Sequence, residues 1–105
     1  MTTLEILKAA RELLSVPERW TKRVSARATD GKSCPIDSPN ATCWCIVGAL
    51  GKITDYALPD ECTDVLREGL PGSLVSFNDA PERTHAEVLA RFDEAIARLE
   101  GSATP

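Results

Sequence analysis

Long apolar runs are missing from this 105-residue sequence. No stretch reaches the roughly 18 consecutive apolar residues that a membrane-spanning helix needs. The first residues also lack the apolar block and small-residue cleavage site of a signal peptide. Internal repeats and low-complexity tracts are missing as well. We therefore expect a cytoplasmic protein with no membrane contact, which forms a single domain over residues 1–105. Its ordered core should cover about residues 3–100, and the last few residues should be frayed.

Positive charge is scarce too. The chain has 12 Lys and Arg residues against 16 Asp and Glu residues, which gives a formal net charge of −4. Nucleic-acid binding normally requires a strong local excess of Lys and Arg. The basic cluster of Arg19, Lys22, Arg23 and Arg27 is small, and a charge run of this kind is typical of a solvated surface. We expect no nucleic-acid partner.

Paired metal-ligand motifs are absent. Cys43 and Cys45 form a single C-x-C pair, while Cys34 and Cys62 stand alone. Structural zinc sites usually present paired C-x2-C or H-x3-H ligands. A zinc site made by these cysteines and His85 is the less favoured alternative. We expect no metal and no cofactor, and in a reducing compartment we expect four free thiols.

Helical periodicity marks both ends of the chain. An apolar stripe follows Thr2, which forms a capping box with Glu5. The last helix has the same signature, because Thr84 and Glu87 form a capping box directly before an apolar stripe, and Gly101 should end it. These two segments predict the first and the last helix.

Two more helices are predicted in the middle of the chain. Thr42 is a candidate cap for a central helix whose apolar face runs through residues 46–57. Gly48 and Gly51 lower the helix propensity of this segment but allow close backbone approach to a neighbour. A short third helix is predicted over residues 62–70.

A β-hairpin is predicted between the first two helices. Apolar and polar residues alternate over residues 20–28, and Asp30-Gly31 supplies the positive φ of a tight turn. Pro35 and Pro39 should keep the return strand short or irregular. The expected fold is mainly α, or α+β in strict terms, with about four helices around one core and a small β-hairpin between the first and second.

A thiol enzyme is one reading of the candidate catalytic residues. Cys45 is predicted in the first turn of a helix, where the helix dipole would lower its pKa. His85 would then serve as the base and Asp79 as the group that orients it. The favoured alternative is that Cys45 is a buried small hydrophobe, since it lies between Trp44 and Ile46.

A polar segment before the last helix is a candidate binding site. Its residues are Phe77, Asn78, Asp79 and Arg83. The favoured alternative is structural: Asn78 and Asp79 bond their own turn backbone, and Arg83 pairs with a carboxylate. The segment should then connect the last helix to the region of Trp44, and Phe77 should be buried. Trp44, like Trp20, is expected to anchor the core rather than to stack on a ligand.

Three sequence segments together resemble a known family. They are Cys43-Trp44-Cys45-Ile-Val-Gly48-Ala49-Leu50, Ser76-Phe77-Asn78-Asp79-Ala80 and Arg83-Thr84-His85-Ala-Glu87-Val88-Leu89. The chain resembles DUF6197, a family of small uncharacterised bacterial and phage proteins, over about residues 4–99. Phe77 stands where the family pattern has Trp, which keeps an aromatic anchor but removes an indole N–H donor. The resemblance implies a fold and a bacterial or phage setting, and it carries over no catalytic residue.

Two classes of function follow from these observations. We expect a small cytoplasmic accessory protein of bacterial or phage origin that acts through contact with an unknown protein partner, with homo-oligomerisation as a further option. The alternative is a small thiol- or metal-dependent enzyme centred on Cys45, Asp79 and His85.

Overall fold

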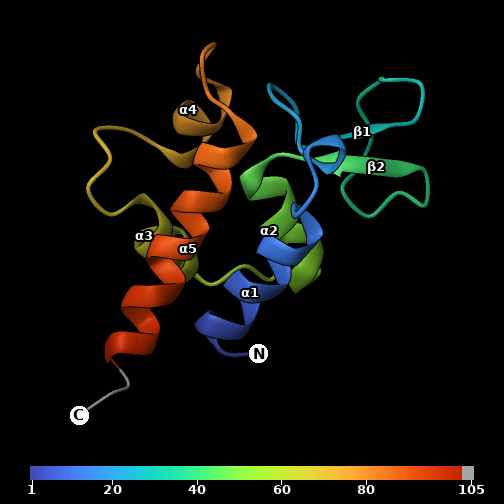
Figure 1. Ribbon diagram of the computed structural model, residues 1–105. Coiled ribbons are helices and arrows are strands. Elements are labelled where there is room, and N and C mark those ends of the chain that lie inside the picture. The colour runs from blue at the N-terminus through green and yellow to red at the C-terminus, as the bar shows by residue number, and fades with distance from the viewer. Residues whose placement is uncertain (103–105) are drawn as a thin grey trace.

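A computed structural model describes residues 1–102 of the chain and confirms a mainly helical fold with a small antiparallel sheet between the first two long helices (Figure 1). Within these residues there are five α-helices, because the segment before the last helix, which the sequence did not assign, is itself helical. The elements are α1 (Thr3–Leu13), the 3-10 helix η1 (Pro17–Arg19), β1 (Ala26–Ala28), β2 (Ala41–Trp44), α2 (Ile46–Thr54), α3 (Asp60–Arg67), α4 (Leu74–Asp79) and α5 (His85–Ser102).

The two predicted capping boxes are both present. The Thr2 hydroxyl accepts the N–H of Glu5 at 3.1 Å, and the Glu5 carboxylate accepts the N–H of Thr2 at 2.8 Å. Thr84 and Glu87 make the same reciprocal pair, at 3.2 Å and 2.9 Å. The predicted end at Gly101 is wrong by one residue, since α5 continues to Ser102. The expected fraying of the last few residues concerns residues 103–105, which lie outside the described residues.

The sheet differs in detail from the predicted hairpin. The tight turn is present, with Gly31 at a φ of +84° and its N–H bonded to the carbonyl of Ala28. β2 begins only after Pro39 and pairs antiparallel with β1. Thr42 lies inside β2, so the prediction that it caps the central helix is wrong. Cys45 is the N-cap instead, and its Sγ accepts the N–H of Gly48 at 3.2 Å.

The core lies between α1, α2 and α5, and α3 packs against both α1 and α5 (Figure 1). The indole N–H of Trp44, which is 6% exposed, donates to the carbonyl of Ile36 at 3.0 Å. Trp20 is half-buried against the core. The largest fully buried apolar side chains are Phe92, Leu7, Leu14, Ile46, Leu50, Leu66 and Val88.

The close backbone approach expected at the glycines of α2 is confirmed at Gly48, while Gly51 lies against a side chain. A Cβ added to Gly48 would lie 2.1 Å from the carbonyl oxygen of Ser25, and one added to Gly51 would lie 2.7 Å from the Cδ1 atom of Ile36. These glycines therefore let α2 lie directly against the segment that leads into β1 and against the loop between the strands.

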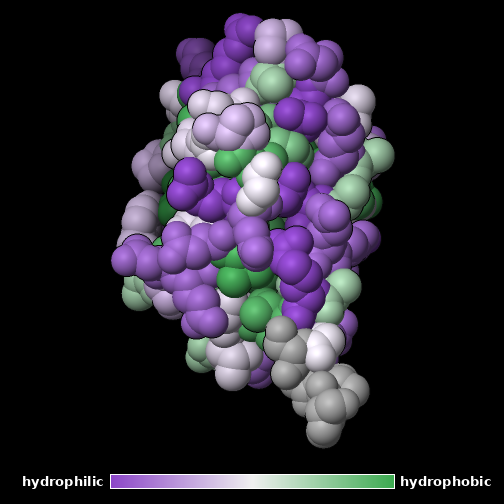
Figure 2. All heavy atoms as spheres, turned by 90° about the vertical axis from the view of Figure 1, so that its left-hand side faces the viewer, coloured by the Kyte–Doolittle hydropathy of each residue, from purple (hydrophilic) through white to green (hydrophobic). Residues whose placement is uncertain are grey.

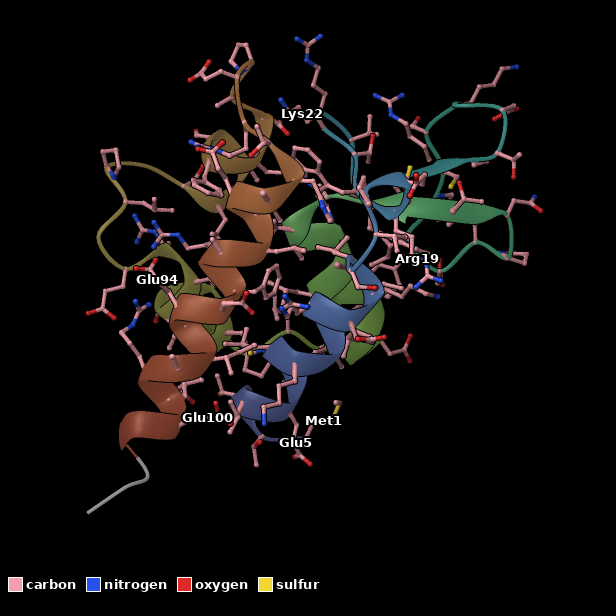
Figure 3. All side chains as sticks on the ribbon, viewed as in Figure 1. Met1, Glu5, Arg19, Lys22, Glu94 and Glu100 are labelled. Atoms are coloured by element: carbon pink, nitrogen blue, oxygen red, sulfur yellow. The ribbon has the colours of Figure 1, made fainter. Side chains whose placement is uncertain are left out.

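Polar side chains cover most of the remaining surface. On the side shown in Figure 2, hydrophilic residues dominate and hydrophobic ones appear in small areas between them. Ion pairs of Lys8 with Glu100 and of Arg11 with Asp93 join α1 to α5, and Figure 3 shows Glu100 on α5 on the side of α1. None of the helices in the described part of the chain has the length and apolar character to cross a membrane.

Candidate functional site

Asn78 is the polar side chain at the centre of the predicted site. α4 places it inward, and it is only 2% exposed. Its Oδ1 accepts the indole N–H of Trp20 at 2.8 Å and the backbone N–H of Ile46 at 3.0 Å. Its Nδ2 donates to the carbonyl of Thr21 at 3.0 Å and to Oδ1 of Asp79 at 2.9 Å. All four hydrogen-bonding positions of the amide are occupied within the protein, so Asn78 has none left for a ligand.

Asp79 and Lys22 extend this contact to the surface. Asp79 Oδ1 also accepts the backbone N–H of Arg23 at 2.8 Å. Lys22 Nζ donates to the carbonyls of Ala80 and Pro81, at 2.7 Å and 3.1 Å, and Figure 3 shows Lys22 on the loop near the connection from α4 to α5. Two contacts therefore hold the loop after η1 against the end of α4: Asp79 bonds the loop backbone, and Lys22 bonds the backbone that follows α4.

Phe77 and Arg83 stack on each other. The guanidinium carbon of Arg83 lies 3.8 Å from the centroid of the Phe77 ring, and its Nε donates to the Phe77 carbonyl at 2.8 Å. Arg83 forms the expected ion pair with a carboxylate, that of Glu87, at 3.3 Å. Phe77 is half-buried, so the expectation of a buried ring is wrong: Arg83 covers one face of the ring, but the ring also lines an open surface depression beside Leu70.

The bonds of Asn78 and Asp79 correct one further expectation. The predicted bonding to their own turn backbone is wrong, because both side chains reach backbone groups of distant segments, at Thr21, Arg23 and Ile46. The predicted link to the region of Trp44 is present through the Ile46 N–H, which Asn78 accepts. We call Trp20, Thr21, Ile46, Asn78 and Asp79 the Asn78 cluster.

Cys45 lies beside this cluster as a helix cap. Its thiol is buried at 9% exposure, and burial raises its pKa above the ordinary value of 9.0. The hydrogen bond from Gly48 opposes this shift, and the negative charge of Asp79 adds to it. The predicted lowering of the pKa is therefore wrong, because desolvation outweighs the helix N-terminus. The thiol is protonated at neutral pH.

His85 occupies a different environment. Its Nε2 lies 2.6 Å from the carbonyl oxygen of Leu14, which caps the end of α1, and its ring centroid lies 6.2 Å from that of Trp20. Cys45 and Asp79 line the same surface depression, but His85 does not line it. Among residues 1–102, no group of three or more His, Cys, Asp and Glu side chains is placed to hold a metal ion.

A second feature lies next to the Asn78 cluster, where three depressions meet at the half-buried side chain of Val47. The Asp79 depression, of about 140 Å³, also includes Asp79, Arg23 and Val75. The Arg67 depression, of about 210 Å³, shares Val47 and Val75 and includes Arg67. The third is the Tyr56 depression, of about 400 Å³, which contains Val47 and Tyr56. We call this continuous surface the α2 face.

Exposed apolar side chains and unusual backbone conformations distinguish the α2 face. Val75 is 52% exposed and Tyr56 is 62% exposed. Tyr56 and Arg23 have φ values of +67° and +73°, in the left-handed region that side chains other than Gly, Asn and Asp rarely adopt. Residues held in such conformations cluster at functional sites.

Asp79, Cys45 and Arg23 of this face are recognisable in the sequence in other roles, but Val75, Tyr56 and Arg67 are not. Val75 falls in a segment to which the sequence assigns no helix or strand, and Val47 lies within the predicted central helix. One signal was available: in a helix over residues 74–79, inward positions for Leu74 and Asn78 place Val75 outward. Its exposure next to α2 depends on tertiary packing.

Comparison with protein families identifies one match. The model described as "Family of unknown function (DUF6197)" covers residues 1–98. Neither the curated proteins nor the solved structures give a significant match. The matched region includes α1 to α4, both strands, the Asn78 cluster, the α2 face and most of α5. The chain therefore belongs to the DUF6197 family.

Proposed function

We propose that the protein is a small non-catalytic accessory protein that acts by contact with another protein through the α2 face. The resemblance seen in the sequence supports a setting in bacteria or their phages. The observation that carries the proposal is the meeting of three depressions at Val47, beside the exposed side chains of Val75 and Tyr56.

The composition of the α2 face supports protein contact. Interfaces are enriched in Tyr and Arg around a desolvated apolar centre. Here Val47 and Val75 form the apolar centre, Arg23 lies in one outer depression and Tyr56 in another. Both outer residues have a left-handed backbone conformation in an exposed position. The Tyr56 hydroxyl donates to Asp37 at 3.0 Å, whereas only the backbone N–H of Arg23 is bonded within the described chain, which favours a role in partner contact for the Arg23 side chain.

The size of the depressions also favours this function. The Asp79 and Arg67 depressions, at about 140 and 210 Å³, are smaller than the roughly 300–1,000 Å³ of small-molecule sites. Each is of a size to receive a single side chain of a partner. The Tyr56 depression is larger, and its lining contains no carboxylate or imidazole that would serve as a general base.

A peptide selection tests the proposal. A random peptide library displayed on phage would be selected on the immobilised protein, and affinities of the selected pool would be measured for the wild type and for Val75→Asp. Val75 is half-exposed, so this substitution leaves the core intact. We expect the pool to bind Val75→Asp at least about tenfold more weakly than the wild type, as for the loss of an interface centre.

Val16→Asp is the matched control, because Val16 is 40% exposed and lies at the start of η1, outside the three depressions. The pool should bind this variant as it binds the wild type. Equal binding to Val75→Asp, or the absence of any selected pool, would overturn the proposal.

A further inference from the structure

The α2 face carries positive charge on two sides of its apolar centre. Arg23 lines the Asp79 depression and Arg67 lines the Arg67 depression, and both depressions share Val47 and Val75. The two arginines therefore flank the two valines. They come from segments far apart in the sequence, the loop after η1 and the last turn of α3.

Neither guanidinium has a carboxylate partner within residues 1–102. Four of the other arginines and lysines are paired with acidic side chains, namely Lys8, Arg11, Arg83 and Arg98. Arg67 makes one long contact, of 3.5 Å, to the carbonyl of Gly72. For Arg23, the backbone N–H is bonded to Asp79, while its side chain forms neither an ion pair nor a hydrogen bond in the described chain. Eight of the 12 Lys and Arg residues form no ion pair within residues 1–102, and Arg23 and Arg67 differ from the other six in their position beside Val47 and the exposed Val75.

Asp79 is the carboxylate that lines the α2 face, but it forms no ion pair with the guanidinium of Arg23 or Arg67. Its Oδ1 already accepts the N–H of Arg23 and the amide of Asn78. The carboxylate is thereby directed to the backbone of the loop. The guanidinium of Arg23 stays available to an external anion, to which its planar group can donate two parallel hydrogen bonds.

We propose that the α2 face binds an acidic segment of a partner protein, in which apolar residues that cover Val47 and Val75 are flanked by carboxylates that pair with Arg23 and Arg67. This inference rests on the proposed function and names the chemistry of its partner. The apolar centre between the arginines favours a peptide over a nucleic acid or a lipid headgroup, because phosphate groups would pair with the arginines but would leave Val47 and Val75 without an apolar partner.

Reversing the charge of Arg23 and Arg67 tests the inference, because it should change the charge of the peptides that the protein selects. The same phage library would be selected in parallel on the wild type and on the Arg23→Glu/Arg67→Glu variant. Peptides from the wild type should be enriched in Asp and Glu on both sides of an apolar pair, and those from the variant should be enriched in Lys and Arg. The wild-type pool should bind the variant at least about tenfold more weakly than it binds the wild type. Its affinity for the wild type should fall as the salt concentration rises.

The matched control is Arg19→Glu/Lys32→Glu, which makes the same change in net charge at exposed positions outside the three depressions. It should select acidic peptides as the wild type does. Circular dichroism and thermal unfolding of all variants would show that each is folded.

The outcomes separate this inference from the proposed function. Peptides that bind, lose binding with Val75→Asp, but show no acidic enrichment would overturn the acidic partner and leave the binding face standing. A pool that is indifferent to Val75→Asp would overturn both. Sedimentation that shows a dimer, abolished by Arg23→Glu/Arg67→Glu, would replace the acidic partner by a second copy of this chain.

Discussion

The side chain of Asn78 in α4 accepts the backbone N–H of Ile46, the first residue of α2, at 3.0 Å. The first N–H groups of a helix have no partner within the helix, and this one is buried. A residue 32 positions later in the chain therefore satisfies the start of the central helix. The same oxygen accepts the indole N–H of Trp20, which joins three segments at one buried atom.

Removal of the Asn78 amide should destabilise the protein strongly. Asn78→Ala leaves the N–H groups of Ile46 and Trp20 without their partner, and each buried unsatisfied group costs about 1–3 kcal/mol. We expect the free energy of unfolding to fall by about 2–4 kcal/mol and the melting temperature by about 10 °C or more. Urea and thermal unfolding would measure this.

Asp79→Ala provides the comparison for Asn78→Ala. Asp79 is half-buried and accepts the backbone N–H of Arg23 and one amide N–H of Asn78, so its loss should cost about 1–2 kcal/mol, less than the loss of Asn78. Melting of both variants at or above the wild-type temperature would show that the cluster does not hold the fold together.

Thr84→Ala should remove the cap of α5. The loss of an N-cap hydroxyl costs about 1 kcal/mol at neutral pH. The backbone N–H of residue 84, which the variant keeps, is the largest cause that lowers the pKa of Glu87, and the Thr84 hydroxyl, which the variant loses, donates to the same carboxylate at 3.2 Å and lowers this pKa further. Since the folded-state pKa lies below the unfolded one, this contribution is present above the ordinary value of 4.5 and is lost as the pH falls through the folded pKa.

The measurement for Thr84→Ala is urea unfolding at pH 7 and at pH 3. The difference between variant and wild type should be larger at pH 7 than at pH 3. Glu12→Ala serves as the control, because Glu12 is exposed in α1 and its side chain caps no helix. A difference that is the same at both pH values would exclude the contribution of Glu87.

Cys45→Ser should preserve the helix cap and weaken the alkaline loss of stability. Burial raises the pKa of the Cys45 thiol above 9.0, so above this pH the unfolded chain loses the proton while the folded protein keeps it. Stability must then fall as the pH rises from 9.0 towards the folded pKa. Serine does not ionise in this range, and it is a good N-cap.

Unfolding with a reductant present, at pH 8 and pH 10, would test this prediction. Cys45→Ser should lose less stability between the two pH values than the wild type. Cys34→Ser replaces a half-buried thiol away from the cap and controls for the loss of a cysteine. An unchanged alkaline loss in Cys45→Ser would contradict the assignment of a buried, protonated thiol.

Gly48→Ala should be far more damaging than Gly51→Ala. A Cβ at Gly48 would lie 2.1 Å from a backbone oxygen, which cannot move without shifting Ser25, and such overpacking costs about 1–3 kcal/mol. At Gly51 the new Cβ meets the flexible end of Ile36. The gain in helix propensity, of about 1 kcal/mol, should offset that contact.

Gly101→Ala is the control for both glycine variants, because a Cβ there has open space around it. Gly101→Ala should be neutral or slightly stabilising in thermal unfolding. If Gly48→Ala melts with the wild type, α2 does not need its close contact to Ser25.

The sequence predicts the helices well where the signal is local. The capping boxes at Thr2 and Thr84 are recognisable because both partners of each lie within one turn. Thr42 was misassigned because its residue type suits a cap, while β2 pairing with β1 decides its conformation. Local propensity does not include that pairing.

The candidate site was predicted only in part. The structural role of Asn78 and Asp79 follows from their residue types, but their actual partners at Thr21, Arg23 and Ile46 are set by tertiary packing. The same holds for Cys45, where burial reverses the pKa shift that a helix N-terminus alone would give. No local sequence pattern marks the α2 face, because its depressions combine residues from distant segments.

The bond between Ile46 and Asn78 also determines when the start of α2 can become fully ordered during synthesis of the chain. A growing chain that ends before residue 78 can form α1, the sheet and the local thiol cap at Cys45, yet it offers Ile46 no side-chain acceptor from α4. The indole N–H of Trp20 also lacks its acceptor until Asn78 is present. During synthesis, the N-terminal half of the protein therefore stays incompletely fixed until α4 arrives and docks, and the final ordering of α2 coincides with the emergence of the C-terminal third of the chain.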